Sequence, residues 1–395
     1  DESGYQVIMS LRRMDSILDF HTDSGLVHCQ AGVILQNLHD AAAAKGRRFP
    51  LTLGGKGSAT IGGLVSTNAG GTQVLRHGPL RQLVAVLLEG SIYDAFSPMK
   101  KDNRGYDLKH LLIGGEGTIG IVTSAIVQTV PALIDRCVVW VGVETPENAY
   151  RLLLFMQTKA RERLEGFEIL PQRALNAVVK HIAGTRAPLD TEHPWHVLME
   201  LVQDDPSQSA PAALATNLLE QAIETAMIEN ATLASSEAQA EAFWKIRDSI
   251  AEAERAEGPA LQHDISVPVA AMSRFIIQES PGIEQKWPGT KTVAFGHLGD
   301  GNIHFHVEAP VGVDTPHWYA TDGKVITSHI YDRVVAYAGS LSAEHGIGQA
   351  KIAEFARLSD PTRISALQAI KNAFDPLGIM NPGKLVPLAQ TPLSP

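Results

Sequence analysis

The stretch Gly296–Val307, GHLGDGNIHFHV, decides how the second half of the chain is expected to fold. A largely apolar run, 292–295, precedes it, and apolar and histidine residues alternate in its last five positions, IHFHV. Between these runs, the segment 298–302 contains an Asp-Gly pair, which is typical of the tight turn of a β-hairpin. The stretch therefore predicts two antiparallel strands joined by a turn, with His297 at the end of the first strand.

The histidines of this hairpin indicate a metal site. Side chains alternate between the two faces of a strand, so His304 and His306 share a face, and the turn can bring His297 beside His304. Two imidazoles and one carboxylate can hold a divalent metal and leave positions open. Glu344 is the best candidate for the third ligand, and His345 next to it is the candidate base. A polar hairpin whose histidines bond to backbone and water is the alternative, and residue types alone leave it open.

Composition narrows the class of protein. A length of 395 residues allows two or three domains, and a hydrophobic content of 44% is ample for a core. The net charge of −10 argues against nucleic-acid binding, so an anionic substrate would need a locally positive pocket. Two cysteines, Cys29 and Cys137, are too few for a disulfide framework and fit a reducing compartment. The sequence shows neither a secretory signal nor a long apolar run, which predicts a cytoplasmic location.

Two glycine clusters stand in the first third of the chain. The first, Gly54–Gly71, consists mostly of small residues, which let backbone N–H groups approach a flat ring or a phosphate. Plain turns are the more common explanation for such a cluster. The second, Gly114–Gly120, contains a formal G-x-G-x-x-G, and Asp135 lies at the spacing of a ribose-binding acid. We reject a Rossmann fold, because that fingerprint needs a following helix and the run 121–127 is β-branched and strand-like.

Beyond Pro131 the pattern predicts an α+β domain with an antiparallel sheet, to which the histidine hairpin would belong. Arg247 lies midway along the last predicted helix, where an arginine most often faces solvent. The predicted strands lie near 137–143, 166–170 and 195–202, and the predicted helices near 146–161, 212–230 and 236–257.

Six ordered segments carry a resemblance that spans nearly the whole chain. Each is a weak signal alone, but together they are specific. The chain resembles the FAD-linked 2-hydroxyacid dehydrogenases, a group that includes D-lactate and D-2-hydroxyglutarate dehydrogenases and the flavin subunit of glycolate oxidase. The segments are Gly57–Gly71, 103–109, Glu116–Thr123, Gly296–His304, Ser342–Lys351 and Asn381–Lys384.

This resemblance implies an α+β fold with two domains. Residues 1–133 would form a vanillyl-alcohol-oxidase-type FAD-binding domain, and residues 134–340 a substrate (cap) domain with an antiparallel sheet and the metal site. The segment 341–395 would return to the flavin domain. In the family a glycine-rich pyrophosphate loop precedes the segment matching residues 1–4. We therefore expect the N-terminal part of the flavin domain to be missing, and these 395 residues alone to bind FAD weakly or not at all.

Two further departures from the family pattern concern its length and its pocket. The stretch 81–90 is a few residues shorter than in relatives. Gln262 stands where relatives that bind 2-hydroxyacids usually carry Lys, and His306 stands where some carry Asn. The identity of the substrate therefore stays open.

The resemblance also implies a reaction, the oxidation of a D-2-hydroxyacid to the 2-oxoacid by hydride transfer to FAD. A metal, Zn or Mn, held by His297, His304 and Glu344 would lower the pKa of the substrate hydroxyl. His345 would accept the hydroxyl proton, and Arg247 would hold the carboxylate with its planar fork.

Analogy with the family assigns residues to the cofactor and to the substrate. Those near the flavin are Ile61, Gly62, Thr67, Asn68, Gly117, Ile121, Val122 and Asn381, and those near the substrate are Arg247, Gln262, His306 and Lys351. The implied partners are a small 2-hydroxyacid and an electron acceptor, which is a protein, a quinone or a cytochrome. A homodimer and a peripheral position at a membrane are compatible with this class. The alternatives are a flavin oxidase of another alcohol without catalytic metal, and a flavin-free degenerate subunit.

Overall fold

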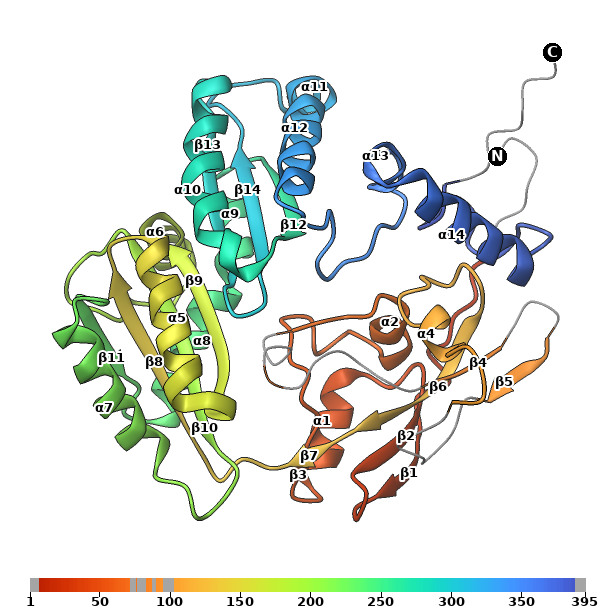
Figure 1. The fold of residues 1–395 in the computed structure, drawn as a ribbon, viewed down its shortest axis with the longest axis horizontal. Helices are drawn as coiled ribbons and strands as arrows, with labels where there is room; N and C mark the ends of the chain where they lie inside the picture. The colour runs from red at the N-terminus through yellow and green to blue at the C-terminus, as the bar shows by residue number, and fades with distance from the viewer. Residues whose placement is uncertain (1–6, 72–75, 77–82, 87–89, 95–102, 388–395) are drawn as a thin grey trace. The chain divides into compact units, whose positions relative to one another are not determined.

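The structure is a computed structural model that describes residues 7–71, 76, 83–86, 90–94 and 103–387, with only the backbone for 83–86. The chain divides into two compact units (Figure 1). Unit 1 consists of Asp1–Gly71, Pro79–Ala132 and Glu344–Pro395, and unit 2 of Thr72–Gly78 and Leu133–Ala343. The expectations for residues 1–4 and for most of 81–90 lie outside the described residues.

Unit 1 is organised around a five-stranded antiparallel sheet in the order β1-β2-β6-β4-β5. The second glycine cluster leads into strand β6, so the strand predicted after Gly120 is confirmed and a Rossmann helix is excluded there. The strands are β1 Ile17–His21, β2 Leu26–Gln30, β4 Leu83–Val86, β5 Ile92–Asp94 and β6 Ile121–Gln128, and the short strands β3 Arg47–Arg48 and β7 Val130–Pro131 pair in a separate two-stranded sheet. The helices are α1 Leu35–Ala43, α2 Ile61–Ser66, α4 Lys109–Leu112, α13 Ile352–Leu358 and α14 Pro361–Phe374.

Helix α2 sits directly on the core of unit 1. Ile61 is fully buried, and the Thr60 hydroxyl caps the helix by accepting the Gly63 N–H at 3.4 Å. A Cβ at Gly62 would lie 2.6 Å from the Ala31 Cβ, so only glycine lets the helix approach the strand end so closely. The first glycine cluster is therefore held tightly where it enters the helix.

Unit 2 contains a seven-stranded antiparallel sheet in the order β11-β8-β10-β9-β13-β14-β12, as predicted in type. Among the described residues, no helix is both long enough and apolar enough to span a bilayer. The strands are β8 Asp135–Val143, β9 Leu164–Pro171, β10 Trp195–Gln203, β11 Asn230–Leu233, β12 Ala260–Ser266, β13 Lys291–His297 and β14 Asn302–Glu308. The helices are α5 Pro146–Ala160, α6 Gln172–His181, α7 Pro211–Glu224, α8 Glu237–Asp248, α9 Ile250–Glu257, α10 Val269–Lys286, α11 Thr315–Ala320 and α12 Asp322–Ala336.

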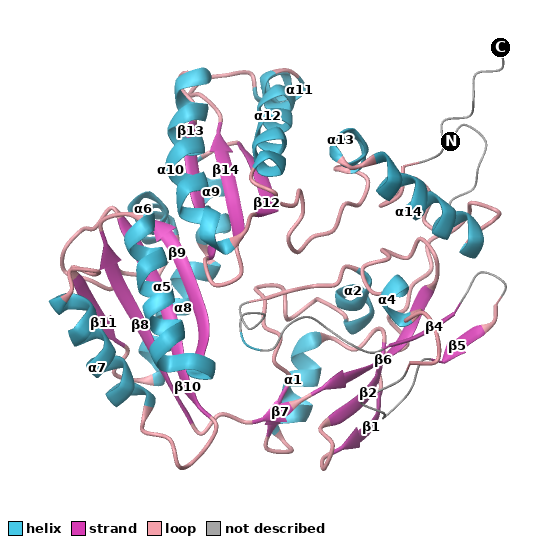
Figure 2. Cartoon of the chain, viewed as in Figure 1, coloured by secondary structure: helices cyan, strands magenta, loops and turns pink. Residues whose placement is uncertain are grey.

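Helices cover both faces of this sheet (Figure 2). On one face, Trp140 and Phe295 pack with Phe243 of α8 and Ile250 of α9 in a single apolar cluster that also includes α6 residues. Helices α5, α7, α10 and α12 contact the strands from the other side. The face covered by α6, α8 and α9 carries the buried charged groups described below, and we call it the charged face.

The predicted helix 236–257 and the end of the predicted helix 212–230 are wrong. The first is two helices, α8 and α9, which are separated at Ser249. The second ends at Glu224, and Asn230 begins β11, because pairing with the edge of β8 outweighs local propensity. Arg247 consequently lies in the last turn of α8.

Candidate active site

The histidine hairpin is confirmed as strands β13 and β14. The Gly301 N–H donates to the His297 carbonyl at 3.0 Å, and the Asp300 carboxylate accepts the Asn302 N–H at 3.0 Å, which closes the turn. Gly296 has a φ of +148°, and a Cβ there would lie 2.4 Å from the Asn302 carbonyl oxygen. The glycine thus lets the two strands meet tightly next to the first histidine.

His297 and His304 lie side by side at the mouth of the hairpin. Their ring centroids are 6.0 Å apart, and the His304 ring stacks on Phe295 at 4.9 Å. Burial, together with the charges of Arg247 and His297, lowers the pKa of His304 well below its usual range. His304 is therefore neutral near pH 7 and keeps a lone pair with which a metal can be bound.

Glu344 reaches the two histidines through the strand connection that precedes it. Ser340 pairs with Ser266 of β12, and the Ala343 N–H donates to the Asp264 carbonyl at 3.3 Å. One donor atom each of His297, His304 and Glu344 lies within 4.8 Å of the others. Donors that share an ion at about 2.1 Å can lie at most about 4.2 Å apart, so small rotamer shifts complete such a set. The residues fit a divalent metal, and its binding stays a prediction.

A residue that the sequence analysis missed, Glu168, links two of the candidate site residues. Strand β9 pairs with β13 so that Glu168 lies directly opposite His297. One carboxylate oxygen bonds to His297 Nδ1, and the other accepts Arg247 Nε–H at 2.8 Å. Burial alone raises the pKa of this carboxyl, but its bonds to His297 and Arg247 outweigh burial and hold the pKa at about 2.

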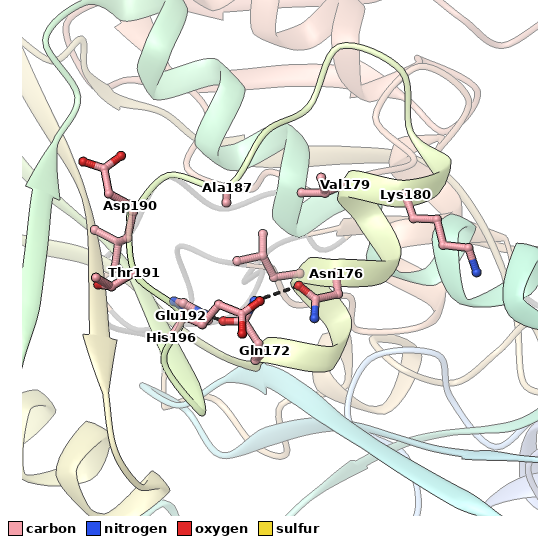
Figure 3. Close-up of a pocket in the computed structure, with 11 residues that line it drawn as sticks. Gln172, Asn176, Val179, Lys180, Ala187, Asp190, Thr191, Glu192 and His196 are labelled. Atoms are coloured by element: carbon pink, nitrogen blue, oxygen red, sulfur yellow. Dashed lines mark hydrogen bonds between the residues drawn. The ribbon is translucent and has the colours of Figure 1, made fainter.

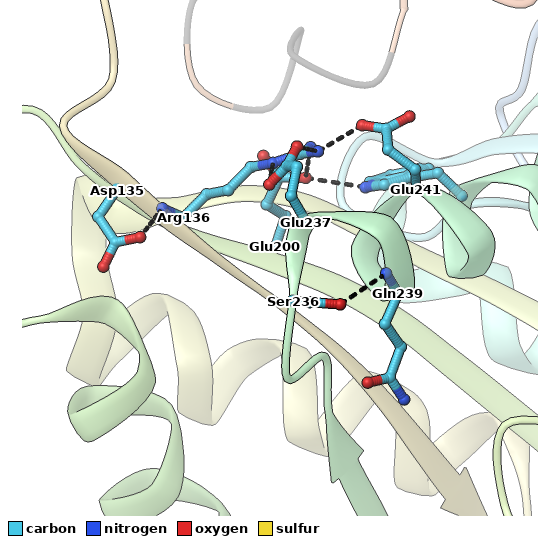
Figure 4. A network of polar contacts seen from close by, with 8 residues as sticks. Asp135, Arg136, Glu200, Ser236, Glu237, Gln239 and Glu241 are labelled. Carbon is cyan, nitrogen blue, oxygen red and sulfur yellow. Dashed lines mark hydrogen bonds and ion pairs between the residues drawn. The ribbon is translucent and has the colours of Figure 1, made fainter.

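Arg247 faces the sheet rather than solvent, with a side chain only 12% exposed. Its guanidinium carbon lies 5.5 Å from the Phe295 ring centroid, and one terminal nitrogen is 3.5 Å from His297 Nε2. The network in Figure 4 fixes α8 against the sheet: Arg136 of β8 bonds to Glu237 and Glu241 of α8 and to Glu200 of β10. An arginine that the helical pattern assigns to the surface is therefore held beside the histidines.

The other residues expected near the substrate have different surroundings. Gln262 is exposed on the edge strand β12, opposite His306 in β14. His306 is 4% exposed, and its Nδ1 bonds to Glu254 of α9, which is also buried. Lys351 belongs to unit 1 and is the N-cap residue of α13.

In unit 1 the two glycine clusters meet at the end of α2. The Gly114 N–H donates to the Val65 carbonyl at 3.0 Å, and the Glu116 N–H donates to the Ser66 carbonyl at 2.8 Å. Asn68, Glu116 and Gly117 have positive φ values of 50°, 49° and 70°, so the backbone turns sharply at both clusters. Of the residues expected near the flavin, Ile61 and Gly62 open α2, Thr67 and Asn68 follow it, and Ile121 and Val122 open β6.

Glu116 also connects the second cluster to the C-terminal part of unit 1. Its carboxylate accepts the N–H groups of Ile347 at 2.7 Å and Gly348 at 2.8 Å, just after His345. The Asn381 side chain donates to the Glu116 carbonyl at 2.7 Å. These small residues and turned backbone amides are of the kind that lies against a planar cofactor, so unit 1 fits FAD.

A separate pocket of about 400 Å³ lies beside α6 in unit 2 (Figure 3). Gln172 lines it and accepts His196 Nε2–H at 2.7 Å, while Trp140 Nε1–H donates to His196 Nδ1 at 3.0 Å. Burial lowers the pKa of His196 to about 4. No residue of the histidine hairpin lines this pocket, so it does not belong to the site above.

Two family models match the chain. The model described as "FAD linked oxidases, C-terminal domain" covers residues 134–385, and the one described as "FAD binding domain" covers residues 2–91. The chain therefore belongs to the family of FAD-linked oxidases, and it is an oxidoreductase with FAD as its cofactor.

Curated relatives indicate which group of FAD-linked oxidases the chain resembles. A mitochondrial D-2-hydroxyglutarate dehydrogenase of Arabidopsis thaliana is 34% identical over 97% of this chain and 67% of the relative. A D-2-hydroxyglutarate dehydrogenase of Xanthomonas citri pv. viticola is 33% identical over 96% of this chain and 79% of the relative. The resemblance to FAD-linked 2-hydroxyacid dehydrogenases is thus confirmed.

Solved structures confirm the fold. The chain is similar to p-cresol methylhydroxylase with substrate bound, with a TM-score of 0.71 and 11% identity over 94% of this chain and 78% of that one. It is also similar to alkyldihydroxyacetonephosphate synthase, with a TM-score of 0.67 and 14% identity over 94% and 66%. At these identities the likeness bears on the fold alone.

Proposed function

We propose that this protein oxidises a D-2-hydroxyacid to the corresponding 2-oxoacid with the help of a divalent metal. The proposal depends on one observation, that ligand atoms of His297, His304 and Glu344 lie within 4.8 Å of one another. Arg247 lies beside this group, with one terminal nitrogen 3.5 Å from His297 Nε2. The D-2-hydroxyglutarate dehydrogenases among its relatives support the substrate class. The electrons then leave to an acceptor, which is a protein, a quinone or a cytochrome.

The chain's own residues divide the work of binding and proton transfer. Arg247 offers paired N–H donors, which match the two oxygens of the substrate carboxylate. His345 accepts the proton of the substrate hydroxyl, which leaves as the C=O bond of the 2-oxoacid forms. Gln262, His306 and Lys351 contact the remainder of the substrate and decide which acyl chain is accepted.

The two absent groups supply chemistry that no side chain offers. FAD, when bound, supplies the acceptor for the hydride from the substrate Cα. A metal, Zn or Mn, when held by His297, His304 and Glu344, supplies the positive charge that favours loss of the hydroxyl proton.

A substrate screen tests the proposed function. The holoenzyme, with its FAD content verified by visible absorption, is mixed with D-2-hydroxyacids, their L-isomers and unrelated alcohols, and reduction of an artificial electron acceptor is followed. We expect turnover of D-2-hydroxyacids only, with loss after chelation and recovery with Zn²⁺ or Mn²⁺. Turnover of another alcohol that resists chelation would instead identify a metal-free oxidase.

A variant of the base makes the same test sharper. His345→Ala should lower kcat about 10²- to 10⁴-fold with little change in KM, because it removes proton transfer in the transition state. An effect on KM alone would contradict the role of His345 as base.

A further inference from the structure

Glu168 is a buried carboxylate on the charged face, and its two oxygens bond to residues of the proposed site. It is 1% exposed, on β9, and its partners come from β13 and α8. Each oxygen has its own partner, His297 Nδ1 for one and Arg247 Nε for the other. A charge this deep is costly to bury unless such bonds compensate it.

We propose that Glu168 is a positioning residue that holds the metal ligand His297 and the substrate clamp Arg247 with one carboxylate, and thereby couples metal binding to substrate binding. This inference rests on the proposed function. It gives Glu168 a role in that function, and it makes substrate binding depend on metal binding.

The contact with His297 selects the ligating form of the ring. An ionised carboxylate only accepts hydrogen bonds, so Nδ1 must carry a proton, and in the neutral ring that binds a metal Nε2 then carries the lone pair. Nε2 lies 3.5 Å from a terminal nitrogen of Arg247, and an ion bound by Nε2 would take the place of that contact. A carboxylate behind a ligating histidine fixes its tautomer and orientation, and losing it typically weakens metal binding about 10- to 100-fold.

The contact with Arg247 fixes the guanidinium from behind. The bond uses Nε, at 2.8 Å, while the two terminal nitrogens carry the donors that match a carboxylate. Because one carboxylate orients both groups, a shift of Glu168 that follows one partner is transmitted to the other.

Glu168→Gln separates this arrangement from mere structural support. An amide has one acceptor oxygen and one NH₂ donor, so it cannot accept from both partners. If the NH₂ faces His297, Nδ1 becomes the acceptor and Nε2 takes the proton, which abolishes ligation. If the NH₂ faces Arg247, two donors oppose each other and the clamp is displaced.

The experiment measures binding as well as turnover. The metal-stripped full chain is titrated with Zn²⁺ against a chromophoric chelator, and 2-oxoacid binding is measured with and without Zn²⁺. For Glu168→Gln we expect Zn²⁺ affinity to fall about 10- to 100-fold and the enhancement of 2-oxoacid binding by Zn²⁺ to be lost. Glu168→Asp, which keeps two acceptor oxygens, should recover part of both.

Glu254→Gln is the matched control. Glu254 is 2% exposed and bonds to Nδ1 of a histidine on the same face, but that histidine, His306, is not in the metal set. We expect its Zn²⁺ affinity to stay within threefold of the starting protein. Circular dichroism and thermal unfolding accompany each variant, and Glu168→Gln combined with Arg247→Met removes the unpaired cation if the single variant unfolds.

Two outcomes would overturn the inference. One is that Glu168→Gln keeps both the Zn²⁺ affinity and the enhancement of 2-oxoacid binding. The other is that Glu254→Gln weakens Zn²⁺ as much as Glu168→Gln does, which would make the effect a general one of buried charge. Failure of the proposed function looks different, because the unaltered protein would then turn over no D-2-hydroxyacid.

Discussion

The charged face of the unit 2 sheet carries two buried glutamate–histidine pairs, and they are built differently. In one, Glu168 uses one oxygen for His297 and the other for Arg247. In the other, Glu254 uses one oxygen for His306, and its second oxygen, Oε1, is buried and has no hydrogen-bond partner among the described residues. Both carboxylates are almost fully buried, at 1% and 2% exposure. Burial alone therefore does not distinguish them, and the number of satisfied oxygens does.

The number of bonded oxygens indicates that the Glu168–His297 pair has the more firmly fixed geometry. A carboxylate with both oxygens bonded has one orientation, and its partners inherit that orientation. A carboxylate with one unpaired oxygen can rotate at the cost of a single bond, so it fixes its histidine less firmly. We therefore expect changes at the His297 pair to have larger and more specific effects than changes at the His306 pair.

The largest expected effect separates the two histidines by activity. His297→Ala removes a metal ligand and should lower kcat/KM on the order of 10³-fold, consistent with several kcal/mol of charge stabilisation by a metal. His306→Asn keeps an N–H donor for Glu254 and should change kcat/KM by less than about tenfold. Steady-state kinetics with the best D-2-hydroxyacid gives both values. Equal losses would mean that the two pairs do not differ in role.

The next prediction concerns Arg247, the cation that bonds to Glu168 of the Glu168–His297 pair. Arg247→Met leaves Glu168 with one partner fewer and should lower the free energy of unfolding by about 3 kcal/mol, as for other broken buried pairs. It should also raise KM about 10- to 100-fold, because charged hydrogen bonds contribute about 1.5–3 kcal/mol.

Arg173→Met is the control for this variant. Arg173 bonds to Glu308 in the same unit, but its side chain is 40% exposed. Urea unfolding should show a loss of at most about 1 kcal/mol, as for exposed pairs. A loss as large as that of Arg247→Met would show that burial of the pair does not set its strength.

His196, also on the charged face, bonds to Gln172 and Trp140 and, among the described residues, to no carboxylate, so its effect on stability should depend on pH. The pKa of His196 is about 4 in the folded chain and about 6.5 when unfolded, so the unfolded chain binds more protons between these values. Its stabilising contribution is complete above pH 6.5 and is lost as the pH falls toward 4. Between pH 7.5 and 5.0 this loss should be about 2 kcal/mol.

His196→Gln isolates this effect. Urea unfolding of both proteins at the two pH values should show a pH dependence that is smaller by about 2 kcal/mol in the variant. An unchanged pH dependence would mean that His196 is not held neutral by its surroundings.

The smallest expected effect belongs to the second pair. Glu254→Gln keeps one acceptor oxygen for His306 and removes the negative charge of the carboxylate. The second carboxylate oxygen, Oε1, has no hydrogen-bond partner among the described residues. Chemical unfolding should therefore show a change of about 1 kcal/mol or less. A destabilisation of about 3 kcal/mol would indicate that the unpaired oxygen contributes more than the structure shows.

Local sequence predicted the hairpin, but it could not predict Glu168. The Asp-Gly turn and the alternation of IHFHV act over a few residues, and the structure confirms that part of the fold. Glu168 lies 129 residues from His297, and only the pairing of β9 with β13 brings them together. Arg247 shows the same limit, because its helix pattern cannot say which neighbour it faces. The structure brings ligand atoms of His297, His304 and Glu344 close together, and metal binding by these three residues stays a prediction.

The carboxylate of Glu116 has a consequence for how the chain folds. It bonds to an amide 231 positions away, with the whole of residues 133–343 lying between the two segments of unit 1. Closing a flexible loop of that length costs about 5 kcal/mol of chain entropy before any constant term. Earlier folding of unit 2 would shorten this loop, and the segment with His345 and Asn381 is synthesised after unit 2. The cofactor side of the enzyme is thus expected to become complete last, after the sheet that carries the histidines.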